Sequence, residues 1–201
     1  MGGNNLQSKR IKLVINILIL IVFIVGLFIT SSILYLNYKG KEKEKALIKE
    51  YENSLIITDD TSDTLKKEKK NINKENIWGL LEIKKINLLS PIVEGVSDEN
   101  FKYSIAHFEN SSLPGEAGNC VLGAHNNVYG SIFENLNELE IGDVIELNYK
   151  NKVYKYKVFT KKVIEPTDFT LLEKGEGKEI TLVTCTNRAK NRLVVKGILI
   201  E

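Results

Sequence analysis

An uncharged apolar run near the N-terminus constrains this chain more than any other feature. From Leu13 to Leu36, 24 consecutive residues carry no charge, and about 20 apolar residues span a bilayer as an α-helix. A cleaved signal peptide has a shorter apolar stretch, about 7 to 15 residues long, that ends at an A-x-A-like site. This run offers only Thr30-Ser31-Ser32 there. The sequence therefore predicts one membrane-spanning helix at 13–36, preceded by a short tail at 1–12.

Basic residues flank both ends of this run, so they leave its orientation open. Lys9, Arg10 and Lys12 lie before it, and five lysines between Lys39 and Lys49 lie after it. Orientation follows the excess of Lys and Arg beside the span, but long domains cross the membrane largely regardless of flanking charge. Lysines beside the membrane are explained by contacts to lipid headgroups.

The segment at 37–76 is rich in Lys, Glu, Asp and Asn. Its composition predicts a helical turn or two over Lys41–Glu52 and a disordered spacer over Asp59–Lys74. We expect this juxtamembrane linker to hold the following domain off the membrane. The alternative is a segment that packs on the domain and regulates access to it.

From residue 77 onward, short apolar runs alternate with turn signals. Strands are predicted at 78–83, 91–94, 120–125, 144–149, 153–163, 180–185 and 193–200, with a hairpin joining the fourth to the fifth. A short helix is predicted over Ser131–Leu139 from the spacing of its apolar residues. Seven or eight short strands indicate a mainly β domain at 77–201, either a closed barrel or a sandwich.

The charge of this domain limits its partners. From Ile77 onward, 15 Lys and Arg residues face 17 Asp and Glu residues, so the domain is near neutral. Nucleic-acid binding therefore has little support, because it requires a basic surface.

One predicted strand ends on a thiol, in the run Thr181-Leu182-Val183-Thr184-Cys185. A thiolate is a strong nucleophile, a histidine moves protons, and an arginine holds a carbonyl or the oxyanion that develops from it. His125 lies sixty residues before Cys185 and Arg192 seven residues after it. These residue types together indicate acyl-transfer chemistry, whereas a lone strand cysteine would be a packed core residue.

Each of these residues has a rival. His107 by itself would be an equally good base, and Arg188 is the other arginine near the thiol. Cys120 precedes His125 by five residues on one predicted strand, and this odd spacing places the two side chains on opposite faces. We therefore expect Cys120 to be a buried thiol rather than a disulfide partner. The cysteines and histidines do not fall at the short spacings of a zinc site.

Taken together, these motifs resemble those of sortases, the membrane-anchored transpeptidases of Gram-positive bacteria. The resemblance covers roughly Trp78 to the C-terminus and lies in the TLxTC motif at 181–185, the stretch from Arg192 to Val195, Gly118–His125 and Pro166-Thr167-Asp168. It implies a closed eight-stranded sortase-type β-barrel with one or two short helices. It also implies a single-pass protein of the cell membrane with its catalytic domain outside the cytoplasm.

The resemblance also implies roles for the candidate residues. The family's histidine follows the GN-x-V-L strand and its arginine opens the final strand, which selects His125 and Arg192. Cys185 would then attack the Thr–Gly carbonyl of an LPxTG-like sorting signal, and an amine of a peptidoglycan precursor would resolve the thioacyl enzyme. The product is a surface protein joined to the cell wall. His107 is expected in a loop near the groove, and Arg188 in a solvated loop.

The same resemblance extends to substrate binding and cofactors. The stretch Val163–Leu172 is similar to the sortase segment that leads into the loop over the substrate groove. We expect the substrate to be bound by Thr184, Pro166, Phe169 and Leu172. No cofactor is expected. Calcium activation, known in some sortases, is kept as an alternative, although Glu173 and Glu176 facing Glu109 and Glu116 form no recognisable ligand set.

Two other functions stay open at this stage. Pilin-polymerising sortases commonly carry an N-terminal lid with an Asp-Pro-aromatic motif and often a second, C-terminal membrane helix, and this sequence shows neither. A sortase that builds pili or trims a specialised substrate is therefore the second hypothesis after the cell-wall-anchoring transpeptidase, and the subclass is unassigned. The third reading is a catalytically inactive, membrane-tethered β-domain that binds a surface partner.

Overall fold

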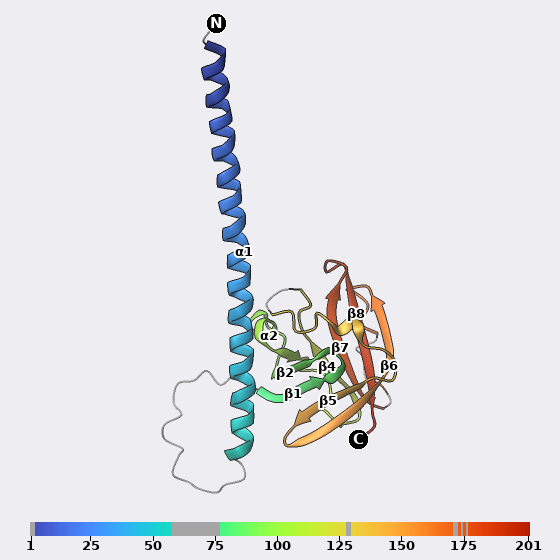
Figure 1. Cartoon of the computed structure of the whole chain (residues 1–201). Coiled ribbons are helices and arrows are strands. Elements are labelled where there is room, and N and C mark those ends of the chain that lie inside the picture. The colour runs from blue at the N-terminus through green and yellow to red at the C-terminus, as the bar shows by residue number, and fades with distance from the viewer. Residues whose placement is uncertain (1–2, 58–76, 128–129, 171–172, 174, 176) are drawn as a thin grey trace. The chain divides into compact units, whose positions relative to one another are not determined.

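The computed structural model describes residues 3–57, 77–127, 130–170, 173, 175 and 177–201 (Figure 1). The chain forms two compact units, one ending at Lys39 and the other spanning Gly40–Glu201. Each unit is described separately below.

Helix α1 (Gly3–Ile57) contains the apolar run predicted to cross the membrane. Its most apolar window has a mean hydropathy of 3.1, and no residue of that window is buried against other parts of the protein. By length and composition this helix is compatible with a single-pass membrane anchor. The helix continues to Ile57, well beyond the turn or two expected over 41–52. The predicted spacer at Asp59–Lys74 lies outside the described residues.

The second unit contains a closed barrel of eight strands, as the resemblance to sortases implied. The strands are β1 (Ile77–Ile83), β2 (Leu88–Glu94), β3 (Ile105–His107), β4 (Gly118–Gly123), β5 (Val144–Tyr149), β6 (Lys152–Ile164), β7 (Lys178–Thr186) and β8 (Asn191–Leu199). Their order around the barrel is β1-β2-β3-β4-β7-β8-β6-β5, and β5 pairs with β1 to close it. The β2–β3 and β4–β7 pairs are parallel, whereas the other pairs are antiparallel.

Alternation along the strands separates the barrel interior from a smaller outer cluster. Leu122 on β4 and Leu182 on β7 are fully buried in the main core. Their neighbours Val121 and Val183 point the other way and pack with Val194 of β8. This follows from the two-residue period of a strand. The outer face of β4, β7 and β8 therefore carries a small apolar cluster of its own.

The predicted hairpin between β5 and β6 is confirmed. Tyr149 pairs with Lys152, which leaves Lys150 and Asn151 as a two-residue turn with φ values of 49° and 62°. Two left-handed residues define the turn whose twist matches a hairpin, and asparagine tolerates that conformation well.

The helix predicted over Ser131–Leu139 is wrong. The segment forms successive i→i+3 turns, including the short 3₁₀ helix η2 (Leu136–Glu138), and Ser131 has a left-handed φ of 52°. Phe133, Leu136 and Leu139 are all fully buried. The spacing of the apolar residues therefore identified the buried side chains correctly. It did not identify the backbone, because successive tight turns can bury residues at the same spacing as an α-helix.

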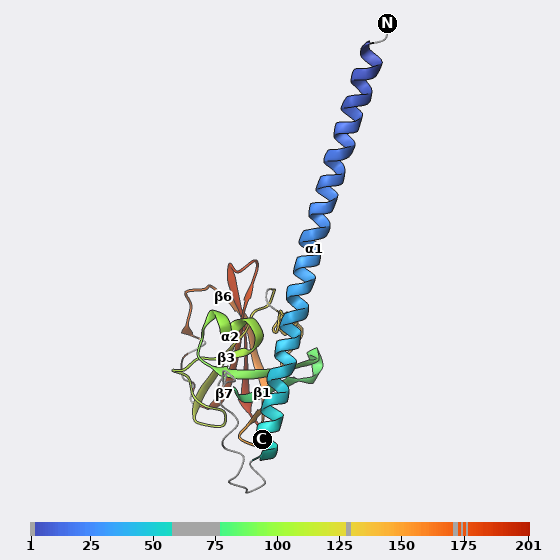
Figure 2. The ribbon, with the colours of Figure 1, turned by 90° about the vertical axis from the view of Figure 1, so that its left-hand side faces the viewer.

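The prediction missed three short elements: α2 (Asp98–Tyr103), η1 (Lys84–Ile86) and strand β3. Helix α2 directly precedes β3 and packs beside it (Figure 2). Ser97 caps α2, since its side chain accepts a hydrogen bond from the Asn100 N–H at 3.1 Å. Serine followed by two acidic residues is a helix start signal.

Candidate functional site

The parallel pairing of β4 with β7 brings the candidate base to the candidate nucleophile. Val121 pairs with Thr181 and Gly123 with Val183, so the same register continued by two residues sets His125 beside Cys185. Two hydrogen bonds extend the pairing past the end of β4. The Ala124 N–H donates to the Val183 carbonyl at 3.3 Å, and the Thr184 hydroxyl donates to the Ala124 carbonyl at 2.7 Å.

The antiparallel pairing of β7 with β8 brings the candidate arginine to the same place. Cys185 is the register partner of Arg192. The Arg192 Nη1 donates to the carbonyls of Ala189 and Asn191, each at 3.1 Å. The connecting turn is unusual because Asn187, Arg188 and Ala189 all have left-handed φ values, between 50° and 66°. Arg188 is exposed in this turn, whereas Arg192 is half-buried.

These residues line one groove, which has a volume of about 240 Å³. His125, Cys185 and Arg192 line it, together with the predicted substrate-binding residues Thr184, Pro166 and Phe169. Leu172, the fourth predicted substrate-binding residue, lies outside the described residues. The remaining lining residues are mostly apolar: Phe101, Phe108, Gly123, Ala124, Ile164, Asp168 and Val183.

The lining residues divide into fixed and accessible groups. Thr184 is buried and its hydroxyl is committed to the main chain of the histidine segment. Phe169 is 62% exposed, so its ring is available to a ligand. The apolar floor beneath the groove comes from the outer cluster of β4, β7 and β8. An extended peptide with an apolar side chain fits such a lining.

The surroundings of His125 change its proton affinity. Partial burial lowers the pKa of His125 below its ordinary value, and the negative charge of Asp98 opposes this shift without overcoming it. The Phe101 ring contributes to this environment, since its centroid lies 5.4 Å from that of the imidazole. The Phe133 N–H holds the His125 carbonyl at 2.9 Å. A lowered pKa makes the charged imidazole a stronger acid than a histidine in water, which favours proton donation.

The second thiol is isolated from this groove. Cys120 is 1% exposed in the barrel core, and both cysteines are free. Burial raises the pKa of the Cys120 thiol far above its ordinary value, with minor contributions from Glu94 and Glu116. Because the thiolate is the reactive form, both the burial and the raised pKa argue against Cys120 as the nucleophile. Cys185 is partly exposed at the end of its strand.

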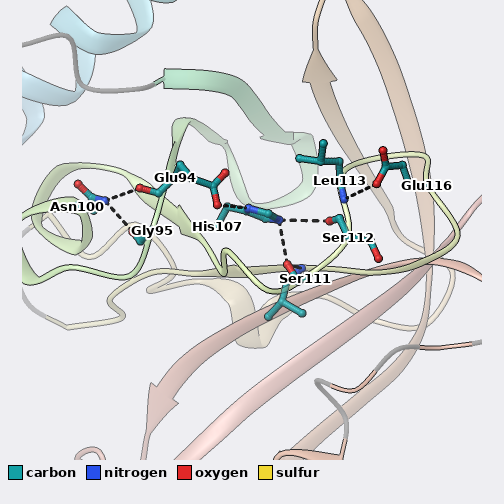
Figure 3. A network of polar contacts seen from close by, with 9 residues as sticks. Glu94, Gly95, Asn100, His107, Ser111, Ser112, Leu113 and Glu116 are labelled. Carbon is teal, nitrogen blue, oxygen red and sulfur yellow. Dashed lines mark hydrogen bonds and ion pairs between the residues drawn. The ribbon is translucent and has the colours of Figure 1, made fainter.

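His107 is not the loop residue that was expected. It lies on β3, is 2% exposed and does not line the groove. Its Nδ1 is 2.8 Å from Glu94 Oε1, and its Nε2 is 2.9 Å from Ser111 Oγ and 3.3 Å from the Ser112 carbonyl (Figure 3). Ser111 Oγ in turn accepts the Val121 N–H at 3.0 Å. His107 therefore joins β2, β3 and β4 instead of reaching a ligand.

This network predicts that His107→Ala is a stability defect. Removing the imidazole leaves a cavity and unpaired buried partners, which costs about 1 to 3 kcal/mol of unfolding free energy. His125→Ala is the matched control, and we expect it to unfold like the wild type because His125 is partly exposed. Chemical denaturation of the two variants measures the difference. Equal stabilities would show that the His107 network contributes nothing.

Sequence reasoning missed part of the groove. Phe101 on α2 and Phe108 after β3 line it, and Asp98 at the start of α2 acts on His125. The start signal at Ser97 was present in the sequence, but a six-residue helix is too short to produce a periodic pattern.

Two further observations concern metal ions and the loop before β7. Among the described residues, no group of three or more His, Cys, Asp or Glu side chains is arranged to hold a metal ion. Glu176, one of the acids considered for calcium, lies outside them. In the loop before β7, the main-chain carbonyl of Glu173 accepts a hydrogen bond from the side-chain amide of Asn119 at 3.2 Å. The Thr181 hydroxyl donates to the same Asn119 side chain at 2.7 Å.

Comparisons with known proteins agree on one family. A family model described as the Sortase domain matches residues 81–200. The chain is 32% identical to sortase SrtE1 of Streptomyces coelicolor over 62% of its length, and 30% identical to sortase D of Bacillus subtilis over 59%. It spans 40% of the first protein and 62% of the second.

Solved structures show the same likeness. A sortase D5 transpeptidase of Clostridium perfringens superposes with a TM-score of 0.66 and 32% identity, covering 79% of this chain and 98% of that one. Sortase C1 of Streptococcus agalactiae has a TM-score of 0.61 and 32% identity over 65% of this chain and 71% of that one. The family model and the solved structures therefore indicate the same family.

Proposed function

The chain belongs to the sortase family, and from this premise we propose that it is a cysteine transpeptidase that cleaves an LPxTG-like sorting signal between Thr and Gly. The observation that carries the proposal is the meeting of three strand ends at one groove. The thiol of Cys185, the imidazole of His125 and the guanidinium of Arg192 come from three different elements, and all line the same cavity.

The proposed reaction assigns one task to each residue. The Cys185 thiolate attacks the Thr carbonyl carbon, forming the C–S bond. Arg192 donates to the oxygen that becomes negative in the tetrahedral intermediate. The C–N bond to glycine then breaks as the charged imidazole of His125 protonates the leaving amine. An incoming amine reverses these steps on the thioester, and its proton returns to His125.

The proposed setting follows from α1 and from the family. We assign 1–12 to a cytoplasmic tail, 13–36 to the membrane anchor, 37–76 to a juxtamembrane linker and 77–201 to an extracytoplasmic catalytic domain. The substrate is a secreted surface protein, and the acceptor is an amine of a peptidoglycan precursor. A sortase that polymerises pilins or processes a specialised substrate is the second candidate, favoured by the similarity to the sortase C1 structure.

The decisive experiment uses the full chain in detergent micelles with an LPxTG peptide. Intact-protein mass spectrometry should detect a thioacyl adduct on Cys185, together with a released glycine-containing fragment. If no adduct and no fragment form, the catalytically inactive, partner-binding alternative is favoured instead. Adding a glycine-based amine or a pilin-derived lysine peptide separates the two transpeptidase candidates by which acceptor is joined.

Peptide specificity provides a further prediction. We expect replacement of the peptide's Leu or Pro by Asp to lower kcat/KM by about 10- to 100-fold, because a charge replaces a group in an apolar pocket. Changing the third residue should have a much smaller effect. Cleavage rates over a small pentapeptide series measure this. Equal sensitivity at every position would contradict an apolar Leu-Pro pocket.

The role of Phe169 in that pocket has its own control. Phe169→Ala should reduce the preference for Leu, because its exposed ring lines the groove. Phe159→Ala is the matched variant, since Phe159 is also exposed, at 40%, but lies on β6 outside the groove lining. If both variants keep the wild-type preference, Phe169 does not form the pocket.

A further inference from the structure

The part of α1 that belongs to the second unit, from Gly40 onward, packs against the rest of that unit along one face. Burial recurs at intervals of three and four residues, whereas the intervening Lys41, Lys45, Ala46 and Lys49 are exposed. This is the pattern of a helix that packs along one side. Between Gly40 and Tyr51 the fully or partly buried residues are Gly40, Lys43, Glu44, Leu47, Ile48, Glu50 and Tyr51, and we define the docking face as all of these except Glu50.

The docking face is held at both ends. Toward its C-terminal end, Tyr51 is 4% exposed, and its hydroxyl lies 3.3 Å from Asn148 Oδ1 and 3.4 Å from the Asn148 carbonyl on β5. Leu47 is 6% exposed. Toward the N-terminal end, Lys43 Nζ lies 3.4 Å from Glu99 Oε1 and 4.3 Å from the centre of the Tyr103 ring. Glu99 and Tyr103 both belong to α2.

Helix α2 depends on such neighbours for its position. It has only six residues, each of which keeps part of its surface exposed, and isolated helices of this length are not stable. Asn100 ties it to the end of β2, because its side-chain amide donates to the Glu94 carbonyl at 2.9 Å and the Gly95 carbonyl at 2.7 Å (Figure 3). The docking face contacts the same helix through Glu99 and Tyr103.

Helix α2 also reaches the catalytic groove. Phe101 lines the groove, and its ring centroid lies 5.4 Å from that of His125. Asp98 acts on the same imidazole through its charge. A displacement of α2 therefore changes both the packing and the hydration of His125.

We infer that the docking face of α1 is a positioning element of the catalytic site: it holds α2 on the barrel, and α2 in turn places Phe101 against His125. This inference rests on the proposed function for its kinetic consequence, but not for its structural one. Lys43, Leu47 and Tyr51 are accordingly positioning residues, since none of them lines the groove.

The test compares Leu47→Asp with Ala46→Asp in the full chain in detergent micelles. Both variants add one carboxylate to the same helix turn, but only Leu47 is buried. We expect Leu47→Asp to speed amide hydrogen exchange over 98–103 by about tenfold or more, because local opening follows the loss of buried apolar contacts. The exchange rates of Ala46→Asp should match those of the wild type. Circular dichroism confirms that both variants remain folded.

Cleavage kinetics test whether the docking face positions His125 or only stabilises α2. Leu47→Asp should lower kcat/KM for an LPxTG peptide about tenfold and move the His125 limb of the pH profile to higher pH. The sign follows because burial lowers the pKa of His125, and a looser α2 reduces that burial. Among the described residues, the charged or titratable groups that act on His125 or line the groove with it include Asp98 on α2, Asp168 after β6, Cys185 on β7 and Arg192 on β8.

A milder pair tests the same contact without introducing a buried charge. Lys43→Met should speed exchange over 98–103 a few-fold and Lys43→Arg should restore it, whereas Lys45→Met on the exposed side should have no effect. A partly exposed ion pair contributes little, so a small change is expected.

Each result bears on the inference. Equal exchange over 98–103 in the Leu47 and Ala46 variants would overturn it. Faster exchange with unchanged kcat/KM and pH profile would also overturn it, because the docking face would then support α2 without positioning His125. If the wild type cleaves no peptide, the proposed function fails, while the exchange experiment still tests the contact.

Discussion

Cys185→Ala is expected to abolish both peptide cleavage and transpeptidation while leaving the fold intact. The thiol supplies the only bond to the acyl group in the proposed reaction, so its loss removes the intermediate altogether. Cys185 is partly exposed at the end of β7, and its side chain belongs to the groove rather than to the barrel core. Cleavage of a fluorogenic sorting peptide, together with a thermal melt, measures activity and fold in one preparation.

Cys120→Ala is the matched control for this experiment. The same substitution inside the barrel should keep most of the activity and lower the stability modestly, because Cys120 is buried in the core away from the groove. An inactive but folded Cys120→Ala together with an active Cys185→Ala would show that the nucleophile has been assigned to the wrong thiol.

Arg192→Ala is expected to lower kcat by about 10²- to 10³-fold, the usual cost of removing one oxyanion donor. The guanidinium lies across the β7–β8 pair from the thiol and lines the groove. Its Nη1 donates to two carbonyls of its own turn. Its side chain is therefore already ordered near the reacting atoms. Steady-state kinetics with a sorting peptide measure the loss.

Arg188→Ala is the matched variant on the same turn. Arg188 is exposed and does not line the groove, so its loss should change kcat less than about threefold, within the small effect of a surface substitution. Arg192→Lys should recover only part of the activity, because lysine keeps the charge but not the planar fork of donors. Comparable losses for Arg188→Ala and Arg192→Ala would remove the basis for the assigned role.

The sequence predicted the strands of this fold well and its short elements poorly. Strands such as β7 show their two-residue alternation directly, with Leu182 in the barrel core and Val183 in the outer cluster. The barrel itself came from the family resemblance, since the spacing of strands left a sandwich open. Helix α2 and strand β3 were not predicted, because six and three residues are too few to show a helical or strand periodicity.

The residues of the candidate site could also be predicted in large part, but the long-range contacts around them could not. His125, Cys185 and Arg192 were selected by motif, and the structure brings all three to one groove. The burial of His107 could not be foreseen, because its partners Glu94 and Ser111 come from separate segments that meet only in the folded barrel. The packing of Tyr51 on Asn148 is likewise a contact across 97 residues.

The parallel pairing of β4 with β7 has a consequence for when the groove forms. Its partners are about sixty residues apart along the chain, as the bond from Thr184 to Ala124 shows, and such non-local pairings make folding slow. Until β7 has been synthesised, β4 has one unpaired edge of the kind that invites aggregation. The nascent chain therefore carries His125 long before Cys185. The groove lined by His125, Cys185 and Arg192 is therefore complete only once β7 and β8 have joined the barrel.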